Sequence, residues 1–403
     1  MRYDFDEITE RKGTNSLKYD FMAENGKAED TLPLWVADMD FQAPLPVRKR
    51  LQEITEHGIF GYSGTKDDYF QALYQWYDTH FQWQIKKEWL VHTPGVVFAL
   101  ASAVRAFTDA GDAVLIQQPV YYPFSGVIKR NNRKLVISPL VLTDGHYEMD
   151  FKDMEKKIAE NNVKLFLLCS PHNPVGRVWK TWELEKAGNI CQKHGVIIVS
   201  DEIHSDFTFP GHTHHMIASL SEKFAEITVT CTAPSKTFNI AGLQVSNIMI
   251  PNVQLREKFV KAVEQTGFFD LNLMGMAACQ AAYEEGEEWL EQLKEYLEGN
   301  LTLIRDFLAE KLPRIHLIEP EGTYLVWLDF RDLNMTEKER EELLGKKAKL
   351  WLDSGIMFGN SGEGFERINM ACPRKVLKKA LEQLEAAIYD SEESMGTVGS
   401  RIV

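Results

Sequence analysis

The sequence predicts an α/β protein in which a large domain with a mostly parallel, doubly wound sheet is joined to a smaller α+β domain. Between about residues 113 and 265, short apolar runs alternate with segments of helical periodicity, as a parallel sheet covered on both faces requires. The chain of 403 residues is long enough for one large and one smaller domain. We therefore expect residues 1–45 to form an N-terminal arm and part of the small domain, residues 46–286 the large domain, and residues 287–403 the C-terminal small domain.

Several elements are expected before residue 113, ahead of the part of the chain in which strands and helices alternate. Residues 1–30 are polar and mixed, which predicts an extended arm, and residues 32–41 predict a short apolar strand that ends on two acids. Prolines at 44 and 46 mark the start of a helix to about residue 57, because proline is favoured in the first helical turn. A loop at 58–64, a helix at 68–81, a strand and turn at 89–95 and a helix at 96–107 follow.

The alternating part supplies the parallel sheet. Strands are expected at 113–117, 134–137, 164–169, 196–200, 227–232 and 247–250, and helices at 122–130, 149–160, 182–193 and 253–265. In doubly wound sheets, ligands bind beyond the carboxyl ends of the strands. The smaller domain is expected to contain a long charged helix at 287–312, strands near 316–319 and 324–328, helices at 337–354 and 376–388, and a loose polar tail at 389–403.

Charge and composition exclude several classes of protein. A net charge of −14 argues against a nucleic-acid surface, which needs a basic patch. No apolar run is long enough to span a bilayer, and the N-terminus lacks the apolar core of a signal peptide. The five cysteines are far apart and form no CxxC pair, so we expect reduced core residues and a cytoplasmic protein. His212, His214 and His215 are expected in a surface loop rather than in a metal site.

Lys236 is the residue around which the chain is organised. It follows the strand expected at 227–232, and a lysine at the end of a buried strand is unusual because its charge resists desolvation. A lone lysine in such a place usually extends its amine to water. The alternative is a Schiff-base lysine, whose amine acts as a nucleophile and shuttles protons.

Two further residues stand at the ends of neighbouring expected strands and favour the second interpretation. Asn173 follows the strand at 164–169 and Asp201 ends the strand at 196–200. Each alone has a structural explanation, since Asn before Pro begins turns and Asp caps helices. Together with Lys236 they meet the needs of pyridoxal 5′-phosphate (PLP): an amine for its aldehyde, a carboxylate for its ring nitrogen and an amide for its O3′.

Other residues complete this cofactor site. Tyr121 follows another strand end and is placed to stack on the ring. The turn at Pro94 and Gly95 feeds a helix whose first N–H groups, at Val96 and Val97, are suited to a phosphate, and Ser235 offers a hydroxyl.

These motifs make the chain similar to the fold-type I PLP enzymes of the class I/II aminotransferase superfamily, and more narrowly to the MalY/PatB group of cystathionine β-lyases (C–S lyases). The resemblance covers nearly the whole chain. The strings that carry it are Trp-Val-Ala-Asp-Met-Asp-Phe, Pro-Gly-Val-Val, Pro-His-Asn-Pro-Val-Gly, Ser-Asp-Glu-Ile-His-Ser-Asp and Ala-Pro-Ser-Lys-Thr-Phe-Asn-Ile-Ala-Gly-Leu-Gln.

The resemblance implies a role for each matching residue. It makes Lys236 the Schiff-base lysine and base, Asp201 the partner of the ring nitrogen, Asn173 the O3′ ligand and Tyr121 the stacking ring, with Tyr121 also a candidate to protonate the departing sulfur. Tyr62 would reach the phosphate in a neighbouring subunit, which implies a homodimer with shared active sites. The residues implied at the substrate are Arg367, Val36 and Ala37, and the guanidinium of Arg367 suits the α-carboxylate.

Two positions depart from the wider aminotransferase pattern. His204, which we count among the cofactor-binding residues, stands where a tyrosine is common, and Gln244 stands where a phosphate-binding arginine is expected. Both departures fit the C–S lyase group. The function they imply is α,β-elimination of L-cystathionine to homocysteine, pyruvate and ammonia. The alternatives are a PLP-dependent aminotransferase and, from another class, a regulator that binds a transcription factor. The preferred sulfur amino acid stays open.

Overall fold

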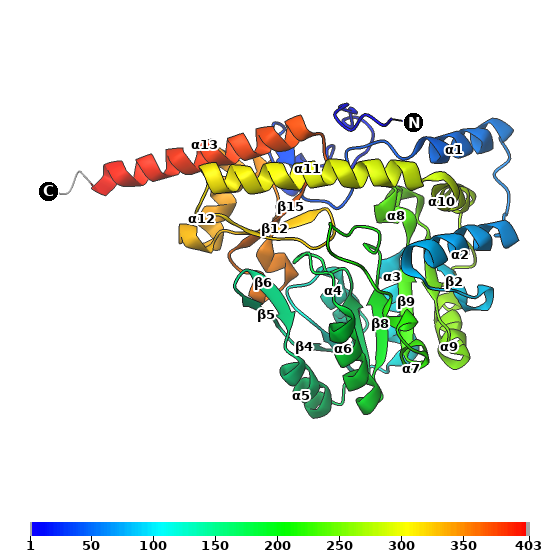
Figure 1. Ribbon diagram of the computed structural model, residues 1–403. Coiled ribbons are helices and arrows are strands. Elements are labelled where there is room, and N and C mark those ends of the chain that lie inside the picture. The colour runs from blue at the N-terminus through cyan, green and yellow to red at the C-terminus, as the bar shows by residue number, and fades with distance from the viewer. Residues whose placement is uncertain (1, 400–403) are drawn as a thin grey trace. The chain divides into compact units, whose positions relative to one another are not determined.

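The chain divides into two compact units in the computed structural model, which describes residues 2–399 (Figure 1). Unit 1 comprises Ala43–Glu291 and the short segment Glu321–Thr323. Unit 2 comprises Arg2–Gln42, Gln292–Pro320 and the chain from Tyr324 onward. The domain boundaries drawn from the sequence, at 46 and 287, lie within a few residues of these divisions, but the passage of residues 321–323 into unit 1 was not anticipated.

Unit 1 is built on a seven-stranded sheet. Five adjacent strands run parallel, and β10 lies antiparallel between β9 and β2. In spatial order the strands are β2 (Leu90–Thr93), β10 (Ser246–Met249), β9 (Thr228–Thr232), β8 (Ile197–Asp201), β7 (Leu165–Cys169), β3 (Ala113–Ile116) and β4 (Lys134–Ile137). The predicted mostly parallel α/β sheet is therefore confirmed, with each strand within one residue or so of its expected bounds.

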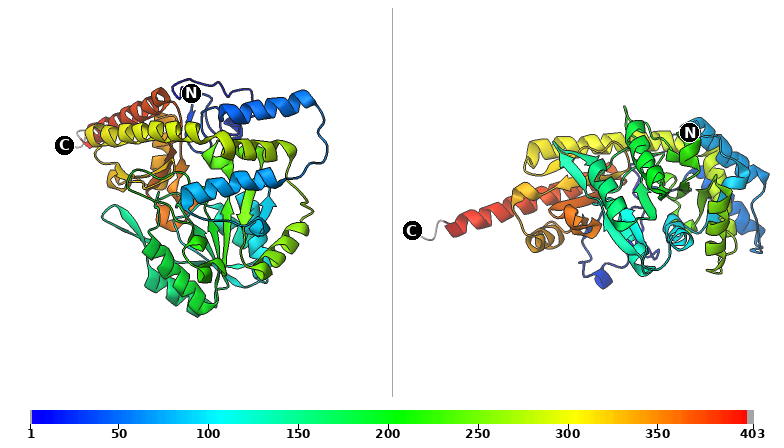
Figure 2. Two further views of the ribbon diagram at one scale, coloured as in Figure 1. Left: turned by 45° about the vertical axis from the view of Figure 1, so that its right-hand side comes forward. Right: turned by 90° about the horizontal axis from the view of Figure 1, so that it is seen from below.

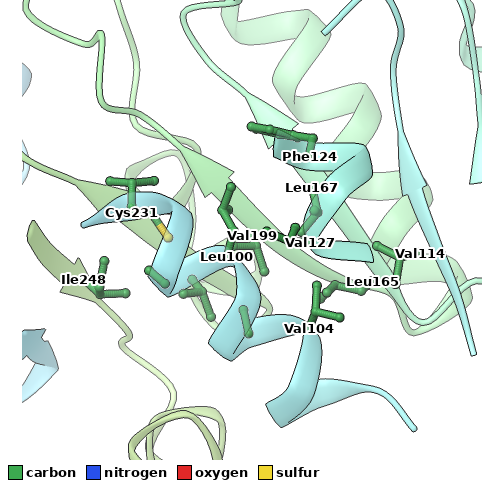
Figure 3. Close-up of a cluster of buried hydrophobic side chains, with 14 of the residues drawn as sticks. Leu100, Val104, Val114, Phe124, Val127, Leu165, Leu167, Val199, Cys231 and Ile248 are labelled. Carbon is green, nitrogen blue, oxygen red and sulfur yellow. The ribbon is translucent and has the colours of Figure 1, made fainter. Parts of the chain in front are cut away.

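Both faces of this sheet are buried. Three helices, α3 (Val96–Phe107), α4 (Pro123–Arg130) and α9 (Val253–Glu264), pack on one face, where side chains such as Leu100, Leu167 and Val199 form one apolar cluster (Figure 3). The alternate strand residues, such as Phe166 and Ile198, are fully buried as well, as period-2 alternation in a doubly covered sheet requires. The other helices of unit 1 are α1 (Leu45–His57), α2 (Asp67–Phe81), α5 (Phe151–Asn161), α6 (Thr181–His194), α7 (Glu222–Ala225), α8 (Pro234–Thr237) and α10 (Leu273–Glu285).

Besides the short helices α7 and α8, two larger elements of unit 1 were missed in the sequence. Strands β5 (Leu140–Thr143) and β6 (His146–Met149) form an antiparallel hairpin that stands out from the sheet in Figure 1 and in the left view of Figure 2. Its turn contains Asp144 and Gly145, both with positive φ, the conformation that a two-residue hairpin turn needs. The second missed element is helix α10.

The segment Glu321–Thr323 is hydrogen-bonded into unit 1. The N–H groups of Glu321 and Gly322 donate to the carbonyl oxygen of Gly176, at 2.8 and 3.0 Å. The Glu321 carboxylate accepts from Nε of Arg177 at 2.8 Å, and the same buried guanidinium pairs with Glu183 at 2.8 Å. A short stretch remote in sequence thereby secures the turn that follows Asn173.

Unit 2 contains a four-stranded antiparallel sheet in the order β11 (His316–Ile318), β12 (Leu325–Asp329), β15 (Phe365–Asn369) and β14 (Asp353–Ser354). Its helices are α11 (Glu287–Lys311, which begins in unit 1), α12 (Glu337–Glu342) and α13 (Arg374–Gly399). A short parallel pair joins β1 (Leu32–Pro33) to β13 (Leu350–Trp351).

Three expectations for unit 2 were wrong. The strand expected at 32–41 is only the two-residue β1. The backbone that follows is held by isolated backbone hydrogen bonds at Leu34 and Asp40 and by side-chain donors, not by a continuous ladder. The helix expected at 337–354 ends early, passes through a π-helical turn (Leu343–Lys347) and gives way to β13 and β14. The tail expected to be loose from residue 389 continues α13 to Gly399, and residues 400–403 lie outside the described residues. No helix among residues 2–399 is both long and apolar enough to cross a membrane.

Candidate active site

Three neighbouring parallel strands end side by side, and each delivers one predicted site residue. The register places Cys169 of β7 opposite Asp201 of β8, and Asp201 opposite Cys231 of β9. Asp201 is the last residue of its strand, Asn173 follows β7 in the next turn, and Lys236 follows β9 on α8. The sheet therefore brings all three to its carboxyl edge, the usual ligand-binding edge of such folds.

Asp201 is a buried carboxylate with little local compensation. Its side chain is 5% exposed, and Oδ1 accepts a hydrogen bond from the N–H of Ile203 at 3.2 Å. Burial raises the pKa of Asp201 to about 7, although this N–H group and the positive charge of Lys236 act in the opposite direction. A cation placed against this carboxylate would restore its ionised form.

Lys236 lies on α8, a helix of only four residues directly after β9. The N–H of Phe238 closes the helical turn on the carbonyl of Pro234 at 3.0 Å, and the N–H of Ile240 donates to the carbonyl of Ser235 at 3.1 Å. The lysine side chain is half-buried, and its charge acts on Asp201. The amine and the carboxylate thus belong to one electrostatic site.

Tyr121 and Asn173 are joined through their backbones. The N–H of Tyr121 donates to the carbonyl oxygen of Asn173 at 3.0 Å, and the N–H of Asn173 donates to Sγ of Cys169 at 3.4 Å. Asn173 is buried and Tyr121 is half-buried. His204 is 4% exposed in the turn that follows Asp201. The structure therefore places Tyr121, Asn173 and His204 on the connections that leave three adjacent strands.

The predicted phosphate-binding groups start from the same sheet edge. Thr93, the last residue of β2, pairs with Ser246, and the next residue of β10, Asn247, pairs with Thr232 at the end of β9. Helix α3 begins just after β2, so its first N–H groups, which have no partner within the helix, lie near the edge where β9 ends.

The side chains at this helix end differ in exposure. Val96 is buried, Val97 is 40% exposed and Ser235 is 9% exposed, with its Oγ donating to the carbonyl of Val245 at 3.4 Å. Gln244, at the position of the expected arginine, is an exposed residue with φ of 52°.

Tyr62 lies in the connection between α1 and α2, far from any strand end in sequence. Its side chain is fully exposed, and the neighbouring Ile59 and Phe60 are 66% and 63% exposed. Exposed aromatic and aliphatic side chains gathered on one loop are typical of a surface that another protein covers.

The predicted substrate residues Arg367, Val36 and Ala37 all belong to unit 2. The guanidinium of Arg367 is 2% exposed, pairs with the carboxylate of Asp353 and donates from Nη2 to the carbonyl of Trp35 at 2.8 Å. Burial raises the pKa of Asp353, while Arg367 acts in the opposite direction.

Side chains from the sheet of unit 2 hold the backbone of this segment. Nδ2 of Asn369 donates to the carbonyls of Val36 and Asp38, at 2.7 and 2.6 Å, and the hydroxyl of Tyr324 donates to the carbonyl of Ala37 at 3.1 Å. Asn369 was not among the predicted site residues, although it lies two residues after Arg367 on the same face of β15.

The histidine segment was described wrongly for one of its members. His214 is 3% exposed, and its Nε2 lies 2.8 Å from Oε2 of Glu202, itself fully buried. No local pattern indicates this acid, because Glu202 lies twelve positions earlier in the chain. Among the described residues no group of three His, Cys, Asp or Glu side chains is arranged to hold a metal ion.

The chemistry of these donors fits PLP. A buried carboxylate with a raised pKa suits a protonated ring nitrogen, and a lysine beside it suits an aldehyde. An open helix N-terminus at the same edge suits a phosphate dianion. In unit 1, Lys236, Asp201, Asn173 and Tyr121 would hold the ring, while Val96, Val97 and Ser235 would hold the phosphate.

Comparison with known proteins gives the family. Residues 29–384 match the model of the family described as aminotransferase class I and II. The chain is 44% identical to "Cystathionine beta-lyase PatB" from Bacillus subtilis over 384 residues, 95% of this chain and 99% of that one. It is 33% identical to "Protein MalY" from Escherichia coli over 391 residues, 96% of this chain and 99% of that one.

Solved structures agree. The crystal structure of cystalysin from Treponema denticola, which contains a pyridoxal 5′-phosphate cofactor, covers 97% of this chain and all of its own, with 42% identity and a TM-score of 0.94. The predicted fold, that of the fold-type I PLP enzymes, is thereby confirmed. The protein belongs to the aminotransferase class I and II family and, within it, resembles the MalY/PatB group of C–S lyases.

Proposed function

We propose that this protein is a PLP-dependent carbon–sulfur lyase that converts L-cystathionine into homocysteine, pyruvate and ammonia. The observation that carries the proposal is the 44% identity, over nearly the whole of both chains, to a protein described as a cystathionine beta-lyase. When bound, PLP supplies an electron sink for the negative charge that forms at the substrate Cα.

The residues of unit 1 are assigned as follows. Lys236 removes the Cα proton, because its amine stands at the strand edge within the field of Asp201. Asp201 retains the proton of the ring nitrogen, and the Asn173 amide donates to the ring oxygen. Tyr121 stacks on the ring and is also placed to return a proton to the departing sulfur.

Further residues fix the cofactor and the substrate. The N–H groups of Val96 and Val97, with the Ser235 hydroxyl, bind the phosphate, and His204 lies in the turn beside the ring. In unit 2, Arg367 binds the substrate α-carboxylate, a task for which its planar fork is suited. Val36 and Ala37 form the backbone segment next to Arg367, held by Asn369 and Tyr324.

The reaction balances without an added oxidant. The Cα–H bond breaks, its electron pair forms the Cα–Cβ double bond, and the Cβ–S bond breaks to release homocysteine as a thiol. The remaining aminoacrylate takes up water and decays to pyruvate and ammonia. No 2-oxo acid is consumed, which separates this reaction from transamination.

The decisive experiment supplies purified protein with L-cystathionine and no 2-oxo acid, and follows pyruvate and free thiol together. Equal and sustained release of both is expected. Lys236→Ala should lower the rate at least about 10²-fold, the usual contribution of a general base, and Lys236→Arg, which keeps the charge, should be equally impaired. Product release that requires a 2-oxo acid would instead identify an aminotransferase.

We also infer a homodimer in which Tyr62 serves the neighbouring active site, supported by its full exposure on an apolar loop. Tyr62→Ala and Lys236→Ala would each be inactive alone. Unfolding and refolding an equal mixture should recover about a quarter of the wild-type activity, because half of the dimers would be mixed and each would hold one intact site. No recovery would place Tyr62 in its own subunit's site.

We propose a cytoplasmic location. All five cysteines are free and buried, as expected for a protein of a reducing compartment.

A further inference from the structure

A second carboxylate of the turn after β8, Asp206, is buried against the helix that carries Lys236. It is 8% exposed, and both of its oxygens accept hydrogen bonds. Oδ1 accepts from Nε1–H of Trp76 at 2.9 Å, and Oδ2 accepts from the Thr237 hydroxyl at 2.5 Å. Within the described part of the chain, no Lys, Arg or His side chain pairs with it at ion-pair distance. The two side chains that donate hydrogen bonds to Asp206 are therefore both neutral.

Thr237 is the residue directly after Lys236 and the last residue of α8. A four-residue helix has too few internal hydrogen bonds to maintain its own geometry, since helix nucleation is unfavourable. The Thr237 side chain is fully buried, so its bond to Asp206 is shielded from water. The bond therefore ties the last residue of α8, next to Lys236, to the turn after β8.

Trp76 of α2 fixes the carboxylate from the opposite direction. The indole is 3% exposed, stacks on His80 at 3.9 Å between ring centroids, and meets Phe238 edge-on at 5.5 Å. Because Phe238 follows Thr237, Trp76 holds the end of α8 twice, once through Asp206 and once through ring packing.

Asp206 also lies on the same turn as Asp201. The N–H of Ser205 donates to the carbonyl of Glu202 at 3.0 Å, and the N–H of Phe207 donates to the carbonyl of His204 at 3.0 Å, so the turn is internally bonded. The ring partner at one end of the turn and the lysine anchor near the other are therefore parts of one rigid connection.

We propose that Asp206, with Thr237 and Trp76, is a positioning group that sets the distance between Lys236 and Asp201. The inference rests on the proposed function, because it presupposes that Lys236 and Asp201 act on one cofactor. None of the three side chains is assigned to touch substrate or cofactor. Their contribution is to catalytic geometry, and loss of the anchor should lower kcat more than it changes KM.

The test compares substitutions at Thr237, Trp76 and Thr230 in the holoenzyme. Thr237→Val removes the hydroxyl and keeps the shape, whereas Thr237→Ser keeps the hydroxyl. Thr230→Val is the matched control, because Thr230 is a fully buried threonine of β9 whose hydroxyl has no hydrogen-bond partner among the described residues. Each variant is assayed for kcat, KM, the pH at which the bound cofactor's absorption band changes, and Tm.

Thr237→Val should lower kcat by about 10- to 100-fold, the effect of a small misplacement of a reacting group, with KM for L-cystathionine changed less than about threefold. It should also move the pH of the absorption change by about half a pH unit or more, since the surroundings of Lys236 change. Thr237→Ser should restore both values, and Thr230→Val should leave both unchanged. Trp76→Phe, which removes the second donor, should reproduce part of the effect.

A Thr237→Val enzyme with lowered Tm but wild-type kcat and an unchanged absorption profile would overturn the proposal and leave a purely structural anchor. If wild-type protein shows the cofactor's absorption band but forms no pyruvate, the lyase function alone is refuted. The pH at which the band changes in the Thr237 variants would then still test whether Asp206 positions Lys236. Wild-type protein without a cofactor band would overturn both.

Discussion

The raised pKa of Asp201 leads to a quantitative prediction for the cofactor-free protein. The pKa rises from the ordinary value of 3.8 to about 7 because the carboxyl is buried. Each factor of ten between the proton affinities of the folded and unfolded chains is worth about 1.4 kcal/mol. Ionised Asp201 therefore costs the folded apoprotein up to ~4 kcal/mol.

The pH dependence follows from the direction of this change. The folded chain holds the Asp201 proton more tightly than the unfolded chain, so this contribution to stability is fully present below about pH 4 and is lost as the pH rises through 7. Asp201→Asn, which cannot ionise, should lack this loss. The difference in the free energy of unfolding between the variant and the wild-type apoprotein should therefore shift in favour of the variant by up to ~4 kcal/mol from pH 4 to pH 8.

The assay is urea denaturation of both apoproteins at one protein concentration from pH 4 to pH 8, comparing midpoints. The difference between the two proteins, rather than either curve alone, isolates Asp201 from the other titrating groups. Asp144→Asn, in the exposed hairpin turn, is the control for exchanging a carboxylate for an amide at an exposed position. A gap between Asp201→Asn and wild type that stays constant from pH 4 to pH 8 would refute the reasoning.

Three further changes test the scaffold. Arg177→Met should lower the free energy of unfolding in a urea titration by about 3–5 kcal/mol, because it leaves two buried carboxylates without their guanidinium partner. The control Lys193→Met, at an exposed ion pair, should lower it by less than about 1 kcal/mol. Asn369→Ala removes the donor to two carbonyls of the proposed substrate segment, so KM should rise several-fold in steady-state assays, and an unchanged KM would argue against that segment. Gly188→Ala places a methyl group 2.6 Å from the ring of Phe224 and should cost about 1–3 kcal/mol, with a Tm equal to wild type as the contrary outcome.

The parts of the fold that could be predicted are those with a strong local signal. Strand β7 is a continuous apolar run, β8 begins with one, and β9 is rich in β-branched residues. Each ends on Asp or is followed within two residues by Pro, so their ends and the residues beyond them were located correctly. The hairpin β5–β6 also carried such a signal, Asp144 followed by Gly145, which was overlooked. Helix α10 had no such local signal, because most of its residues are buried and its sequence therefore lacks the alternation of apolar and polar faces that marks an amphipathic helix.

The candidate site was predictable only in its principal residues. Lys236, Asp201 and Asn173 were selected because each follows a strand that the sequence already indicated. Asp206 and Asn369 act through hydrogen bonds to residues far away in sequence, and no period or motif announces such partners. The same limit explains the error at His214, whose acidic partner lies in another turn.

The short segment Glu321–Thr323 has a consequence for any attempt to dissect the protein. Because these residues complete unit 1, a fragment that spans only 43–291 would lack the acceptor of Arg177 Nε and the N–H donors to Gly176. The cofactor-binding half is therefore not a detachable module of contiguous sequence. A workable fragment would have to carry residues 321–323 back to it, for example through a designed linker after residue 291.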